Sequence, residues 1–130
     1  SNKTPSYEDL IAQCRKDAQD AQDRMAEQQI TDAADLKRER CMARDREADS
    51  RDSEAMRRGA IDATEFAKRA EARREQRRIE LDAVDKTRDA DLAALRRSFR
   101  KRDEAAGDAV SSDSSSDSSG DSSAESSDGE

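Results

Sequence analysis

The sequence predicts an all-α protein made of extended charged helices, as a coiled coil or a helical hairpin, followed by a disordered acidic tail. Leu, Ile, Val and Phe together number thirteen among 130 residues, too few for a conventional globular core. Charged residues make up 44% of the chain, and 25 bases nearly cancel 32 acids. From Ser111 onward the chain contains only Ser, Asp, Glu, Gly and one Ala.

After a short lead at 1–4, a first helix is expected over 5–47. Thr4 is the candidate N-cap and Pro5 suits the first helical position, so the helix should begin within two residues of Pro5. Its first part carries a heptad-like row, which keeps one face aligned for a partner helix: Tyr7, Ile11, Cys14, Ala18, Ala21, Met25 and Gln28. Ile30, Ala34 and Cys41 continue a displaced stripe.

A bend is expected at 48–53, because no large apolar residue occurs between Arg44 and Ser53 and because Asp52 or Ser53 could cap a second helix. That helix should cover 54–106. Gly59 is expected to weaken it without stopping it, at a cost of about 1 kcal/mol.

The second helix has an eleven-residue period, whose members are Phe66, Ala70, Arg73, Arg77, Leu81, Val84, Arg88, Leu92, Leu95 and Phe99. Its richest part predicts an oligomerisation seam formed by Leu81, Val84, Leu92, Leu95 and Phe99. A basic patch overlaps the end of this row and contains Arg96, Arg97, Arg100, Lys101 and Arg102. This patch fits a cationic helix end, a nuclear-import signal, an RNA or lipid contact, or a docking site for the chain's own tail.

The tail, 107–130, is expected to begin at Gly107, which can end the helix. Its acidic spacing suits kinases such as casein kinase 2, which recognise Ser with an acid three residues on. The phosphorylation candidates that meet this rule are Ser114, Ser118, Ser122 and Ser127. Each phosphate would add roughly −1.5 to −2 charges. A plain solubilising tail is the alternative.

Catalysis, cofactor binding and metal binding are not expected. The chain has no His, and its two cysteines, Cys14 and Cys41, lie too far apart for a zinc spacing. Residues 1–110 are nearly neutral overall, which argues against nucleic acid as the main partner. No membrane span and no secretion leader is visible, so a cytoplasmic or nuclear location, or one within a virus particle, is expected.

The leading functional hypothesis is a non-enzymatic structural or assembly protein. In this view a helical rod associates with itself, with other helical proteins, or along a particle or filament, and carries a phosphorylatable tail. A virion component is one such setting, because Arg strongly outnumbers Lys, as in GC-rich viral genomes. The alternative is a chaperone or binding module whose acidic tail takes a basic protein partner. A third reading is a single charged helix acting as a spacer.

Overall fold

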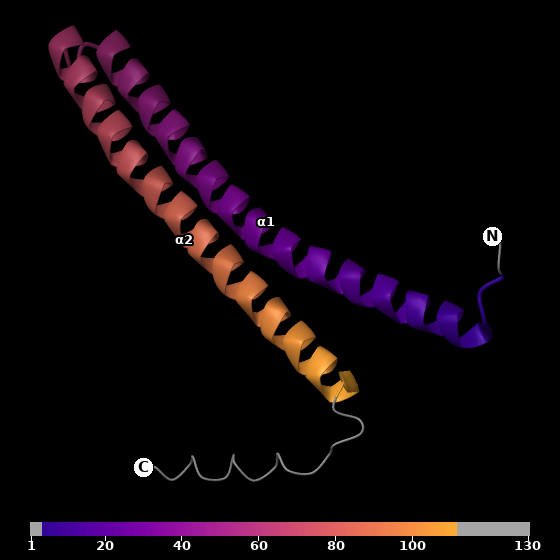
Figure 1. Cartoon of the computed structure of the whole chain (residues 1–130). Coiled ribbons are helices and arrows are strands. Elements are labelled where there is room, and N and C mark those ends of the chain that lie inside the picture. Colours follow the sequence, from indigo (N-terminus) through magenta and orange to yellow (C-terminus); the bar gives the residue numbers. More distant parts are fainter. Residues whose placement is uncertain (1–3, 112–130) are drawn as a thin grey trace, which may run out of the picture. The chain divides into compact units, whose positions relative to one another are not determined.

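The computed structural model describes residues 4–111, and within this range the fold is all-α, as predicted. It consists of α1 (Tyr7–Arg57, 51 residues) and α2 (Ala63–Ser111, 49 residues). The chain divides into a hairpin unit, Ser1–Ala94, and a C-terminal unit, Leu95–Glu130. In the hairpin unit α1 and the first part of α2 lie side by side and antiparallel (Figure 1). Of the two predicted arrangements, the structure therefore has the helical hairpin.

A capping box fixes the start of α1, and it begins at Ser6, one residue after the predicted pair Thr4 and Pro5. Ser6, rather than Thr4, is the N-cap: its hydroxyl accepts a hydrogen bond from the backbone N–H of Asp9 at 3.1 Å. The Asp9 carboxylate in turn accepts from the backbone N–H of Ser6 at 3.3 Å. This reciprocal pair satisfies two backbone donors that the first turn leaves open, so α1 begins at Tyr7, within two residues of Pro5.

The chain turns at 58–62, so the bend predicted at 48–53 is wrong. Gly59 adopts φ +83°, which favours glycine. The backbone N–H groups of Gly59 and Ala60 donate to the carbonyls of Met56 and Ala55 at 3.0 and 2.8 Å, a Schellman-type ending. Gly59 thus ends α1 instead of being tolerated within a helix.

The second helix begins at Ala63, not at residue 54. Asp62 caps it, because its side chain accepts from the backbone N–H of Glu65 at 2.8 Å. At the other end α2 continues through Gly107 to Ser111. The expectation that Gly107 ends the helix is therefore also wrong. The rest of the predicted tail, with all four phosphorylation candidates, lies outside the described residues.

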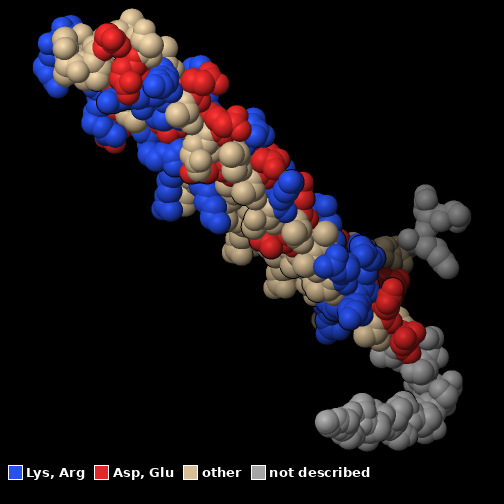
Figure 2. Space-filling model, turned by 90° about the vertical axis from the view of Figure 1, so that its left-hand side faces the viewer, with Lys and Arg blue, Asp and Glu red and all other residues tan. Residues whose placement is uncertain are grey.

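The surface of the described helices is strongly polar. On the face drawn in Figure 2, acidic and basic side chains lie close to one another over much of the surface. Within residues 4–111, no helix combines the length and the apolar character that crossing a membrane requires.

Candidate functional site

The face that α1 turns toward α2 follows a heptad of small and charged residues. Its members are buried or half-buried and recur at steps of four and three: Ala34, Arg38, Cys41, Asp45, Ala48, Asp52 and Ala55. Small side chains therefore alternate with charged ones. Only Ala34, Asp45 and Asp52 are buried among the described residues, with exposed fractions of 5%, 3% and 8%. The hairpin is thus held together around carboxylates rather than around large apolar side chains.

The matching face of α2 is the eleven-residue row found in the sequence. Within the hairpin unit every member of that row is half-buried: Phe66, Ala70, Arg73, Arg77, Leu81, Val84, Arg88 and Leu92. The structure thereby confirms the period over 66–92. Three residues of the predicted oligomerisation seam, Leu81, Val84 and Leu92, consequently lie on the face that packs within the chain.

Near the turn, two aspartates of α1 meet two arginines of α2. Asp52 contacts Arg69 at 3.1 Å and Arg73 at 2.8 Å between charged atoms. Arg73 also reaches Asp49, with its Nη2 2.6 Å from Oδ1. These contacts explain why α1 continues through 48–53: the segment has no large apolar side chain, but its carboxylates are bound by the neighbouring helix.

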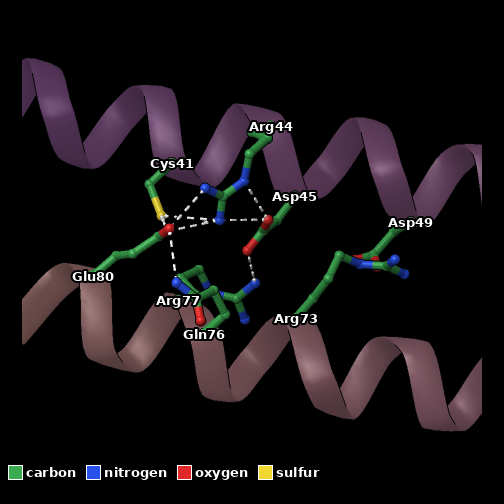
Figure 3. Close-up of polar contacts among 8 residues, drawn as sticks. All are labelled: Cys41, Arg44, Asp45, Asp49, Arg73, Gln76, Arg77 and Glu80. Carbon is green, nitrogen blue, oxygen red and sulfur yellow. Dashed lines mark hydrogen bonds and ion pairs between the residues drawn. The ribbon is translucent and has the colours of Figure 1, made fainter.

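The next contact, between Asp45 and Arg77, is the most buried of the series. Arg77 Nη1 donates to Asp45 Oδ2 at 2.6 Å, and Arg44 Nε donates to Oδ1 at 2.9 Å (Figure 3). Desolvation of Asp45 raises its pKa, but the hydrogen bonds from Arg77 and Arg44 outweigh this, so that the pKa lies below its usual range. Asp45 is therefore charged at neutral pH although almost no water reaches it.

Asp52 and Asp85 show the same electrostatic effect. The Arg73 guanidinium is the main cause that holds the pKa of Asp52 below its usual range, against the effect of desolvation. At the far end of the hairpin unit, Arg38 Nη1 lies 2.8 Å from Asp85 Oδ1 and lowers the pKa of that carboxyl. The bound carboxylates thus stay ionised along the contact.

Glu80 of α2 is the centre of a second polar cluster. Arg44 Nη1 donates to Glu80 Oε2 at 3.1 Å, and Arg44 Nη2 lies 2.8 Å from Oε1. The Cys41 thiol donates to Oε1 at 3.1 Å, and Gln76 Nε2 donates to Oε2 at 3.2 Å. These donors, with Arg44 first, lower the pKa of Glu80 to about 2. Burial and the bond to Glu80 raise the pKa of the Cys41 thiol, which disfavours a reactive thiolate.

The apolar part of the contact encloses little space. A cavity of about 50 Å³ is lined by residues that include Ala34, Val84 and Arg88, which is room for very few water molecules. Three other hollows found on the described residues are open grooves lined mainly by charged side chains, two over α1 and one where α1 meets α2. The described contact can hold two helices together, but it offers no enclosed chamber for a substrate.

Most of the heptad row predicted for the start of α1 is exposed. Tyr7 and Met25 are 75% and 63% exposed, and Leu10, beside them, is 52% exposed. Cys14 is exposed as well. Of the seven predicted members of this row only Ile11 and Ala21 are half-buried. The row is thus an exposed face in the hairpin unit.

The remaining predicted site residues belong to the C-terminal unit. Leu95 and Phe99 are half-buried there. Arg102 lies over the Phe99 ring at 5.0 Å from its centroid and donates to Asp103 at 3.0 Å. The other four bases of the patch, Arg96, Arg97, Arg100 and Lys101, are exposed.

No protein-family model matches the chain, and neither a curated protein nor a solved structure is similar to it. Its function is therefore inferred from its own residues. Two signals in the sequence point to the interface that the sequence prediction missed. Asp45 and Asp52 are seven residues apart, as are Cys41 and Ala48, and together they make a heptad without large apolar members.

Proposed function

We propose that this chain is a non-enzymatic structural or assembly protein whose helices associate with further helices through the exposed row of α1. The observation that carries the proposal is the exposure of Tyr7 and Met25 of this row, and of Leu10 beside it, on a helix that packs within the hairpin farther along its length, over 34–55. Heptad spacing of such residues is typical of a face that pairs with another helix. The simplest partner is a second copy of the chain.

The pairing of α2 with α1 of the same chain supports the exposed row of α1 as the surface for association. Leu81, Val84 and Leu92 are half-buried within the hairpin unit, so they have less apolar area to offer to a partner. Burying apolar surface stabilises association by about 25 cal/mol per Å², and the exposed side chains of the α1 row retain that area. Self-association is therefore assigned to α1 rather than to the seam at the end of α2.

A structural role also fits the chemistry of the described part of the chain. The carboxylates with altered pKa are each bound by arginine and held in their ionised form, as Glu80 is by Arg44. Such groups stabilise a fold and are poor proton donors at neutral pH. In the same proposal the Ser-rich tail remains a substrate for acid-directed kinases, which would add charge to the assembled protein.

Sedimentation equilibrium in high salt, with circular dichroism over the same concentration series, tests this function. High salt weakens ion-pair association and leaves apolar association intact. We expect a reversible oligomer that the double variant Tyr7→Glu, Met25→Glu weakens at least tenfold, because it places charge in the contact. Ile79→Glu is the matched control, since Ile79 is 49% exposed on α2 and outside the row. A chain that stays monomeric in high salt at every concentration would refute the proposal.

A further inference from the structure

The hairpin binds several acids of α1 and leaves most of the bases of that helix exposed. Asp45, Asp49 and Asp52 are bound by arginines of α2, whereas Glu39, Glu47 and Glu54 of the same part of α1 stay exposed. Over 37–58 seven bases and four acids are exposed, so the exposed surface of this segment carries an excess of positive charge.

The exposed bases form a regular row. Lys37, Arg44, Arg51 and Arg58 recur every seven residues, and Arg40 lies beside the first two. Seven residues are two helical turns, so these four side chains follow one side of α1 at intervals of about 10.5 Å. We call these five residues the basic row. Shallow grooves on α1 are lined in part by its members.

Much of the positive charge of the basic row is not neutralised by the described residues. Lys37, Arg40 and Arg58 have no ion pair within residues 4–111. Arg51 lies 3.9 Å from Glu47, with both side chains mostly exposed, which is a weak contact. Arg44 alone is firmly bound, by Glu80 and Asp45.

We propose that the basic row binds the acidic Ser/Asp tail, residues 112–130, of a second copy of this chain. The tail carries six acids and no base, which makes it the segment whose charge best complements the row. Asp113, Asp117, Asp121 and Glu125 recur every four residues. An extended chain spaces such residues about 13 Å apart, close to the spacing of the bases.

A second copy is favoured over the chain's own tail because the proposed self-association brings the tails of other copies to each basic row at a high local concentration.

The same contact explains why a tail is favoured over nucleic acid. Residues 1–110 are nearly neutral overall, so they offer no extended positive surface to a long polyanion, whereas a tail of the same protein brings only a short anionic segment. Phosphorylation of the tail should tighten the contact, because each phosphate adds acceptors and charge that suit arginine. This inference deepens the proposed assembly function and rests on it.

The test uses full-length chains with complementary defects. A row variant, Lys37→Gln, Arg40→Gln, Arg58→Gln, removes bases that have no ion pair, so the hairpin is retained. A tail variant replaces Asp113, Asp117 and Asp121 by Asn. Association is measured by sedimentation velocity at about 20 mM and about 500 mM salt, where exposed charge contacts are strong and screened respectively.

We expect wild-type chains to form larger species at low salt than at high salt, because a tail-to-row contact is heterologous and can repeat. Each variant alone should no longer form the larger species at low salt, because its association is weakened roughly tenfold. A mixture of the two variants should recover pairs that contain one of each, since one chain supplies the tail and the other the row. The control triple variant Arg15→Gln, Arg24→Gln, Lys68→Gln removes the same charge elsewhere and should change association less than threefold.

Several results would overturn the inference. A mixture that recovers no pairs would show that the tail does not bind in trans, and an unchanged row variant would show that the row is not its site. Tighter binding of the tail variant to a single-stranded RNA than to a synthetic tail peptide of equal charge would reassign the row to nucleic acid. None of these results affects the salt-resistant oligomer, so the proposed function stands or fails separately.

Discussion

Replacing Asp45 by Asn should test whether a buried carboxylate determines how the two helices pair. The amide keeps the size of the side chain but removes its charge, and so weakens the 2.6 Å hydrogen bond from Arg77. Asp45 is only 3% exposed, so water cannot replace the lost partner. Hydrogen bonds to charged groups contribute about 1.5–3 kcal/mol, and a buried unpaired charge adds to that loss. We therefore expect the free energy of unfolding to fall by about 2–3 kcal/mol.

The assay is urea denaturation followed by circular dichroism at a fixed chain concentration. With a slope of about 1–2 kcal/mol/M, the midpoint should move by roughly 1–2 M, or the variant should be unfolded without urea. Asp20→Asn is the matched control, because within residues 4–111 Asp20 forms an ion pair only with the exposed Lys16. It should change stability by less than about 0.5 kcal/mol. Equal effects of the two substitutions would refute the reasoning, as would zero coupling between Asp45→Asn and Arg77→Met in a double-mutant cycle.

Three further predictions concern pH, glycine and cysteine. Arginine lowers the pKa of Glu80 to about 2 from 4.5 and also lowers the pKa of Asp52, so their stabilisation should be complete above about pH 4.5 and disappear as pH falls toward 2. Helicity at 222 nm that does not change over this range would contradict this. Gly59→Ala should destabilise the hairpin by about 1 kcal/mol because φ is +83°. Gly107→Ala should instead stabilise the C-terminal part of α2 by up to about 1 kcal/mol, and thermal melts that shift in the same direction for both variants would contradict these two expectations. Cys14 is exposed, whereas Cys41 is half-buried and its pKa is raised. Cys14 should therefore react with a thiol reagent at pH 8 at least tenfold faster than Cys41. Equal rates would show that Cys41 is not held by Glu80.

The fold class and one face of the interface could be predicted from the sequence. The eleven-residue row of α2 contains large side chains such as Leu81 and Val84, which mark a periodic face clearly. The facing row of α1 could not be found in the same way, because Ala48 and Asp52 carry no apolar signal. Their role depends on Arg69 and Arg73, which are distant in sequence and are brought close only by the turn.

The turn itself was misplaced because local signals competed. Asp52 and Ser53 are good capping residues, but Asp52 is used to bind α2 instead. Asp62 followed by Glu65 is an equally good start signal, and Gly59 just before it provides the stop. Arg69, Arg73 and Arg77 likewise repel one another when α2 is considered alone. Their spacing is explained by the neighbouring aspartates of α1.

The central claim is that α1 and α2 of one chain pair antiparallel around these ion pairs. It is tested most directly by the distance between spin labels at Glu39→Cys and Ala83→Cys, both exposed positions, in a chain with Cys14→Ser and Cys41→Ser. Paired helices lie 8–10 Å apart between axes, so with label linkers we expect roughly 20–30 Å. The same distance should persist when labelled chains are diluted with unlabelled ones. A distance of about 66 Å, as in one continuous helix at 1.5 Å per residue, or a short distance that vanishes on dilution, would contradict the account.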